Sequence, residues 1–226
     1  MKYEFVEGDS AQGLDGRILR RIRALTDIPS RHIRAGSLGG YIESESNLSH
    51  DGAAWVGGVA RAYGGAFIGG DALLHGSSIA HEDALLSDAC IVGGQAQICG
   101  HATILGNATV SGAACIWGDA TVSGDAMIGE QMLLPGGAVI FARDMAQYFG
   151  EVIDGCLSPV TLYSDREGGI SVVTNTFSGD VRDYLEHVKK AKSLVVTPTH
   201  LMMVGLARKR IQAAQAAYAR RQRMAA

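Results

Sequence analysis

A small set of histidine, cysteine and aspartate side chains recurs at intervals of eighteen residues. His81 and Cys99 form one such series, and Asp83, His101 and Asp119 form a second, two residues further along. A histidine beside an aspartate is the usual arrangement of a general base, and two histidines with a cysteine can bind zinc. The spacing therefore makes His81, His101, Asp83 and Asp119 the candidate catalytic residues. A metal, if one is bound, would be held by His81, Cys99 and His101.

The chemical interpretation competes with a structural one. Outward corner positions of any repeating coil carry polar side chains because they face water. The residue between the two series is often glycine, which lets the neighbouring side chains diverge. The two interpretations predict different geometry: a site requires these side chains to converge, whereas solvated corners leave them apart.

The eighteen-residue interval arises from a shorter repeat. Fifteen consecutive six-residue units run from Gly52 to Phe141 without an insertion. In every unit but the one with Met132, a small residue, usually Ala, occupies one position. An aliphatic residue or Ala follows two positions later, and Gly occupies most positions two before the small one. Inward residues two apart indicate a short strand, and the recurring Gly permits a corner. Three such units close one triangular coil, so the pattern predicts five stacked coils, with a partial coil begun by Ile42 and Leu48 in the same phase.

This repeat resembles that of the hexapeptide-repeat family, as in Val110–Cys115 and Val122–Met127. The resemblance implies a left-handed parallel β-helix. It also makes a coenzyme A-dependent acyltransferase a candidate function. In that family a loop that protrudes from the coils shapes the acyl-donor cleft, and no loop interrupts this repeat. The related γ-class carbonic anhydrases bind zinc through three histidines, whose pattern His75, His81 and His101 do not reproduce. No catalytic residue is therefore carried over by position.

The segments outside the repeat predict two further units. Residues 1–41 alternate as a β-rich N-terminal cap, 42–141 form the β-helix, and 142–226 form a C-terminal α+β region. In that last region we expect a short helix over 144–149, a hairpin of 160–164 with 170–174, a helix over 179–190 capped by Ser178, and a long final helix over 199–223. The predicted fold is thus mainly β.

The cap also resembles a known group. The stretches at 21–25, 35–45 and 47–49 are similar to the N-terminal cap of β-helical proteins from bacteriophages, prophages and enterobacteria, which are often labelled acyltransferases because of their repeat. The resemblance implies a fold and a phage-type source rather than a reaction.

Two apolar surfaces predict self-association. One outward column of the coils is too apolar to face water along its length. The final helix carries a short seam of apolar residues at spacings of three and four. The predicted interface residues are Trp55, Leu73, Ile91, Met127, Val204, Ile211 and Tyr218. We expect a homo-oligomer, either a dimer or a trimer.

Charge and composition limit the kinds of binding partner and the cellular location that we expect. The net charge of −3 argues against a general polyanion binder, so nucleic acid is an unexpected partner. The four cysteines show no disulfide spacing, and no apolar stretch predicts a membrane span, which favours a cytoplasmic protein. The arginine-rich final helix is either a solvated face or a contact for an acidic partner.

Two functions follow. The first is a phage-type binding protein that engages a host protein, for example a defence factor, without a cofactor. The alternative is an acyltransferase that uses a coenzyme A thioester, with His81 or His101 as the base. The unbroken repeat favours the first.

Overall fold

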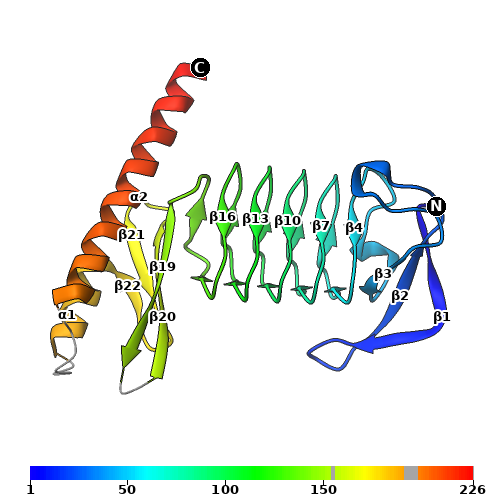
Figure 1. The fold of residues 1–226 in the computed structure, drawn as a ribbon, viewed down its shortest axis with the longest axis horizontal. Helices are drawn as coiled ribbons and strands as arrows, with labels where there is room; N and C mark the ends of the chain where they lie inside the picture. Colours follow the sequence, from blue (N-terminus) through cyan, green and yellow to red (C-terminus); the bar gives the residue numbers. More distant parts are fainter. Residues whose placement is uncertain (154–155, 191–197, 226) are drawn as a thin grey trace.

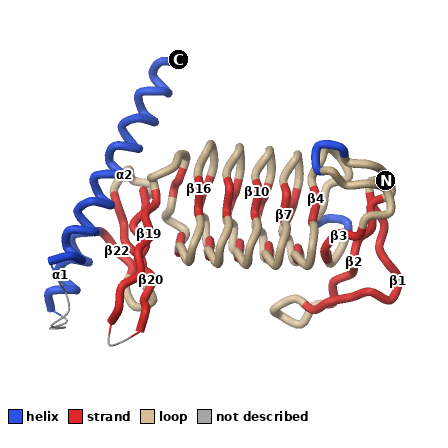
Figure 2. The backbone as a smooth tube through the Cα atoms, in the orientation of Figure 1, coloured by secondary structure: helices blue, strands red, loops and turns tan. Residues whose placement is uncertain are grey.

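The chain folds into a long prism of coils with a different cap at each end (Figure 1). The structure is a computed structural model, and it describes residues 1–153, 156–190 and 198–225. The prism occupies the middle of the molecule, the N-terminal strands close one end, and a small sheet with two helices closes the other. Figure 2 shows how little of each coil is strand and how much is turn.

Fifteen two-residue strands build the prism, one in every six-residue unit from β4 (Trp55–Val56) to β18 (Val139–Ile140). The strands between them are β5 (Arg61–Ala62), β6 (Phe67–Ile68), β7 (Leu73–Leu74), β8 (Ile79–Ala80), β9 (Leu85–Leu86), β10 (Ile91–Val92), β11 (Gln97–Ile98), β12 (Thr103–Ile104), β13 (Thr109–Val110), β14 (Cys115–Ile116), β15 (Thr121–Val122), β16 (Met127–Ile128) and β17 (Leu133–Leu134). Each strand pairs in parallel with the strand three units later, so that Ile91 lies opposite Thr109. The uninterrupted parallel solenoid is confirmed, and its hand stays a prediction.

The predicted inward positions fill the core of the prism. Ala102, Ile104, Ala114 and Ile116 are fully buried, as are their counterparts in the other coils. Since each inward residue stacks on a similar residue one coil away, one short pattern is sufficient to build a continuous dry core.

The N-terminal cap extends one face of the prism. Strands β1 (Tyr3–Gln12), β2 (Ile18–Ala24) and β3 (Leu38–Ile42) join that face, and β3 pairs in parallel with β5. Two short 3₁₀ turns, η1 (Pro29–Arg31) and η2 (Glu45–Asn47), complete the cap. The buried Asn47 side chain donates to the carbonyls of Gly64 and Ala66, which satisfies backbone groups that an open end would leave unpaired.

The predicted partial coil exists, but in a different phase. Ile42 lies opposite Ala62 and Leu48 opposite Ile68, twenty residues later rather than eighteen. The corner between Leu48 and β4 is therefore two residues longer than the others. Prediction of an unchanged phase was wrong here because inward burial alone does not fix the length of a corner.

After the prism the chain forms a four-stranded antiparallel sheet of β19 (Ala146–Ile153), β20 (Cys156–Ser164), β21 (Ile170–Val173) and β22 (Ser178–Asp180). The predicted hairpin is confirmed as β20 and β21. The helix expected at 144–149 is wrong: these residues lead into strand β19, which pairs with β20 along its whole length. Long-range pairing outweighed the local pattern.

Two helices cover this sheet, α1 (Val181–Lys190) and α2 (Pro198–Ala225). The cap of α1 is Asp180 rather than Ser178, because Asp180 Oδ1 accepts the N–H groups of Arg182 and Asp183 while Ser178 belongs to β22. The long final helix is confirmed, and its C-terminal half extends past the sheet on the side of the last coil, where Tyr218 stacks on Phe141 (Figure 1). No helix in the described part of the chain is long and apolar enough to span a membrane.

Candidate functional site

The predicted corner residues do lie on neighbouring coils. Tyr63 and His81 stack with ring centroids 5.3 Å apart and nearly parallel planes. The Tyr63 hydroxyl accepts the backbone N–H of Leu14, which holds the tip of the β1–β2 hairpin against this corner. His81 is therefore part of a packed contact between cap and prism.

The acid–base partners come near each other without forming a tight pair. His101 Nδ1 lies 3.7 Å from Asp83 Oδ2, and the two side chains are 70% and 64% exposed. His81 Nδ1 lies 3.9 Å from Glu82 Oε1, again beyond hydrogen-bond distance. Two solvated side chains at this separation interact weakly, so the corner lacks the fixed orientation that a general base requires.

Cys99 is poorly suited to bind metal or act as a nucleophile. Burial raises the pKa of its thiol to about 11, with nearby Cys115 and Glu82 acting in the same direction. Metal binding and nucleophilic attack both need the thiolate, which is scarce at neutral pH when the pKa is this high. Among the described residues, no cluster of three histidine, cysteine, aspartate or glutamate side chains could hold a metal ion.

Asp119 completes the predicted set and also stays apart. Its side chain is exposed, and its backbone carbonyl accepts a hydrogen bond from Arg166 of the β20–β21 turn at 2.9 Å. Stacking brings these residues onto one corner, as predicted, but it does not bring His81, His101, Asp83 and Asp119 together around one point.

The carboxylates at the corners have a structural task that the sequence analysis did not assign. Glu82 and Asp88 stand where most units have Gly, with φ angles of 57° and 56°. The N–H of Gly100 donates to Glu82 Oε2 at 2.6 Å, and the N–H of Gly106 donates to Asp88 Oδ2 at 2.9 Å. Each side chain thus bonds the turn of the next coil and offsets the strain of its own backbone. In the sequence, the carboxylates that replace Gly at these two positions were the feature that could have indicated this role.

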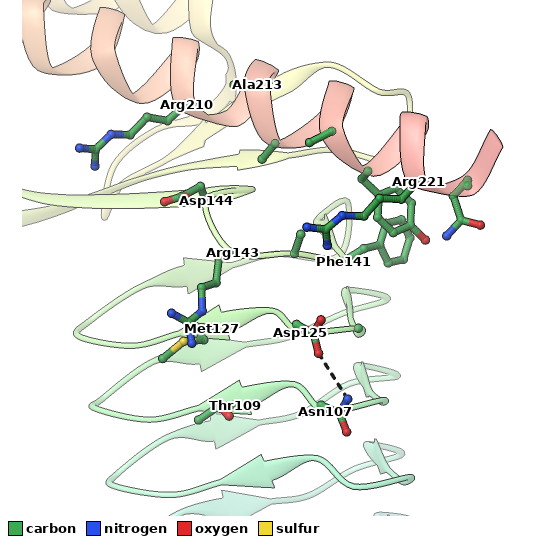
Figure 3. Close-up of a pocket in the computed structure, with 16 residues that line it drawn as sticks. Asn107, Thr109, Asp125, Met127, Phe141, Arg143, Asp144, Arg210, Ala213 and Arg221 are labelled. Carbon is green, nitrogen blue, oxygen red and sulfur yellow. Dashed lines mark hydrogen bonds between the residues drawn. The ribbon is translucent and has the colours of Figure 1, made fainter. Parts of the chain in front are cut away.

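A groove that the sequence did not predict lies at the C-terminal end of the prism, between α2 and the last coils (Figure 3). Its volume is about 920 Å³. We call it the C-terminal groove. Its walls are one face of α2, the turn after β18 and the outer side of the coils, with the residues Asn107, Thr109, Asp125, Met127, Phe141, Arg143, Asp144, Arg210, Ala213, Ala214, Ala217, Tyr218 and Arg221 among its lining.

The groove combines an apolar wall with charged groups. Phe141 and Tyr218 stack with ring centroids 5.0 Å apart, which anchors α2 to the last coil. Arg143, Arg210 and Arg221 are exposed along it. Sequence reasoning noted the cations of the final helix, but Arg143 lies more than sixty residues earlier, and only the tertiary contact brings it to the same place.

The predicted interface residues fall into two groups. Val204 and Ile211 are buried against the four-stranded sheet of the same chain, and Trp55 is buried beneath the cap. Leu73 and Ile91 remain half-buried, and Met127 is 47% exposed beside the C-terminal groove. The chain itself therefore covers part of the surface expected to bind a second copy.

Comparison with known proteins supports the β-solenoid fold and indicates no activity or partner. A family model described as the YdcK beta solenoid repeat matches residues 96–112, which lie in the middle of the prism. No curated protein matches the chain. The chain is thus similar, over this segment, to a β-solenoid repeat.

Proposed function

We propose that the chain is a non-enzymatic binding protein in which the prism is a rigid scaffold and the C-terminal groove is the working surface. The observation that supports this best is the contrast between the corner residues and the C-terminal groove. The corner residues are either packed or solvated and do not converge, whereas the groove gathers exposed arginines and an apolar wall in one concave place.

The scaffold role follows from the coils themselves. No loop leaves the prism between β4 and β18, so the coils contain no element that closes over a substrate. A stack of this kind holds its two ends at a fixed separation. The phage-type origin and the host protein as partner, both suggested by resemblance of the cap, belong to this proposal.

The alternative is an acyltransferase that uses a coenzyme A thioester. The proximity of His101 to Asp83 is the observation in its favour. It would require His101 to act as a base on a substrate bound in open solvent, which offers no exclusion of water.

The two functions separate in one experiment. We expect no increase in melting temperature on addition of coenzyme A, acetyl-coenzyme A or zinc, and no thioester cleavage above background. The variant His81→Ala with His101→Ala should behave identically in both assays. Thioester turnover in the parent protein that disappears in this variant, with the fold intact by circular dichroism, would overturn the proposal in favour of the enzyme.

A further inference from the structure

Charge is strongly segregated along this chain. Helix α2 carries six arginine and lysine residues and no carboxylate, whereas residues 42–141 carry ten carboxylates and one arginine, a net charge of −9. The acidic prism and the basic helix meet at the C-terminal groove.

The three arginines of the groove have no carboxylate partner within the described part of the chain. The ion pairs there all lie in residues 1–101. Arg210 donates only a long hydrogen bond, 3.4 Å, to Gln147 Oε1. The two carboxylates that line the groove are engaged with amides instead: Asn107 donates to Asp125, and Gln147 donates to Asp144.

The arginines are also regularly placed. Arg210 and Arg221 are eleven residues apart on α2, which is three helical turns, so both face the groove about 16 Å from each other. Ala213, Ala217 and Tyr218 lie between them on the same face, and Arg143 reaches toward Met127 from the opposite wall (Figure 3). The result is a row with positive ends and an apolar centre.

An extended peptide matches this row. Side chains of an extended chain alternate between its two faces, so carboxylates at positions one and seven of a heptapeptide point to the same side, about 20 Å apart, within reach of the flexible Arg210 and Arg221 side chains. Apolar side chains between them would lie on Met127, Ala217 and Tyr218. Guanidinium groups bind carboxylates through paired hydrogen bonds, which favours arginine over lysine at such ends.

We propose that the C-terminal groove binds an extended peptide segment of a partner protein that carries two acidic residues six positions apart, with apolar residues between them on the same face. This rests on the proposed function and names the chemistry of its partner. A nucleic acid fits less well because a phosphate on every nucleotide would place charge over the apolar centre of the row, at Ala217 and Tyr218, as well as at its two ends. A second copy fits less well because the carboxylates along the coils of its prism, such as Asp83, Asp88 and Asp119, stand in tight turns rather than on a free extended segment.

The test uses a fluorescein-labelled heptapeptide, Asp-Ser-Leu-Ser-Leu-Ser-Asp, blocked at both ends, in which both Asp and both Leu share one face, and its twin with both Asp replaced by Asn. Binding to the full-length protein is followed by fluorescence anisotropy at low and high salt. We expect the acidic peptide to bind more tightly than its twin and to weaken with salt. The variant Arg210→Gln with Arg221→Gln should bind it about tenfold more weakly, because two charge-assisted contacts are lost.

The matched control is Lys209→Gln with Arg220→Gln, which removes the same charge from adjacent positions of α2 that do not line the groove. It should change affinity only slightly. Equal losses in both variants, no preference over the Asn twin, tighter binding of a twelve-nucleotide oligothymidylate, or displacement of the peptide by self-association would each overturn the proposal. If the peptide does not bind as expected and no thioester is cleaved, only the proposed peptide ligand is refuted. Thioester turnover that depends on His81 and His101 would instead refute the proposed binding function itself.

Discussion

Cys90 shows how one buried thiol links stability to pH. It occupies the inward small position and is fully buried, and burial raises its pKa from 9.0 to about 12. The folded state therefore keeps this proton while the unfolded state loses it above pH 9. The contribution to stability is complete below pH 9 and is lost as the pH rises toward 12, at up to about 1.4 kcal/mol per pH unit.

We expect Cys90→Ala to fold normally, because Ala fills this position in most units, and to lose less stability between pH 8.5 and 10.5 than the parent. Urea midpoints at the two pH values measure the difference. Lys2 acts in the opposite direction, since burial lowers its pKa to about 8 and its deprotonation relieves that cost at higher pH. Lys2 is common to both proteins, so the comparison isolates Cys90. An unchanged alkaline loss in the variant would contradict the assignment.

Asp88 tests whether a side chain can replace glycine at a corner. Its φ is 56°, and its carboxylate accepts the Gly106 N–H. Asp88→Ala keeps the strain and loses the hydrogen bond, so we expect a loss of about 1–3 kcal/mol. Asp88→Gly loses the hydrogen bond but also the strain, and should stay within about 1 kcal/mol of the parent. Thermal unfolding measures both variants, and an Ala variant at least as stable as the Gly variant would contradict the role of the carboxylate.

At the scale of the element, the coil is the unit that makes the inward pattern predictive. In strand β12, Ile104 points into the core of the prism and is fully buried, whereas its neighbour Thr103 faces outward and is partly exposed. Ile104→Asp should cost several kcal/mol because an unpaired charge enters a dry core. Thr103→Asp, the same residue one position away, should retain the parental melting temperature to within a few degrees. Similar melting temperatures for the two variants would show that the inward phase is wrong.

The elements also explain which parts of the structure could be predicted. Each coil contacts copies of itself a fixed eighteen residues away, so Ile104 and Ala114 could be placed from the period alone. The strand at 146–153 depends on β20, and the groove depends on Arg143 meeting α2, contacts that leave no period in the sequence. The corner illustrates the limit within the repeat: stacking placed Asp83 and His101 on adjacent coils, but convergence depends on side-chain direction, which the period does not encode.

At the scale of the whole molecule, both ends of the prism are closed, and the outermost strand of the N-terminal cap is protected against pairing with further strands. Strand β1 is the exposed edge of the eight-stranded sheet, and its pairing with β2 is interrupted between Phe5 and Ser10, where Gly8 has a positive φ. Glu4 and Asp9 on this strand pair with Arg23 and Arg21. A bulge and charged side chains are common ways to prevent further strands from adding to an edge. The arginines of β2 are therefore engaged within the cap, whereas Arg143, Arg210 and Arg221 of the C-terminal groove are available to a partner.

The oligomeric state is the prediction that belongs to the molecule as a whole. With Trp55, Val204 and Ile211 buried within the chain and Met127 beside the C-terminal groove, Leu73 and Ile91 are the residues of the predicted column that are left for a second copy. We expect Leu73 and Ile91, which are direct neighbours on paired strands, to contact a second or third copy, since adjacent apolar side chains are costly to leave in water. Light scattering at micromolar concentration should then give the mass of a dimer or trimer. Leu73→Lys with Ile91→Lys should give a monomer with an unchanged circular dichroism spectrum, because both side chains point outward, while Gln97→Lys on another face should leave the assembly intact. A parent protein that is monomeric at this concentration would refute the prediction and would mean that the C-terminal groove acts on a single chain.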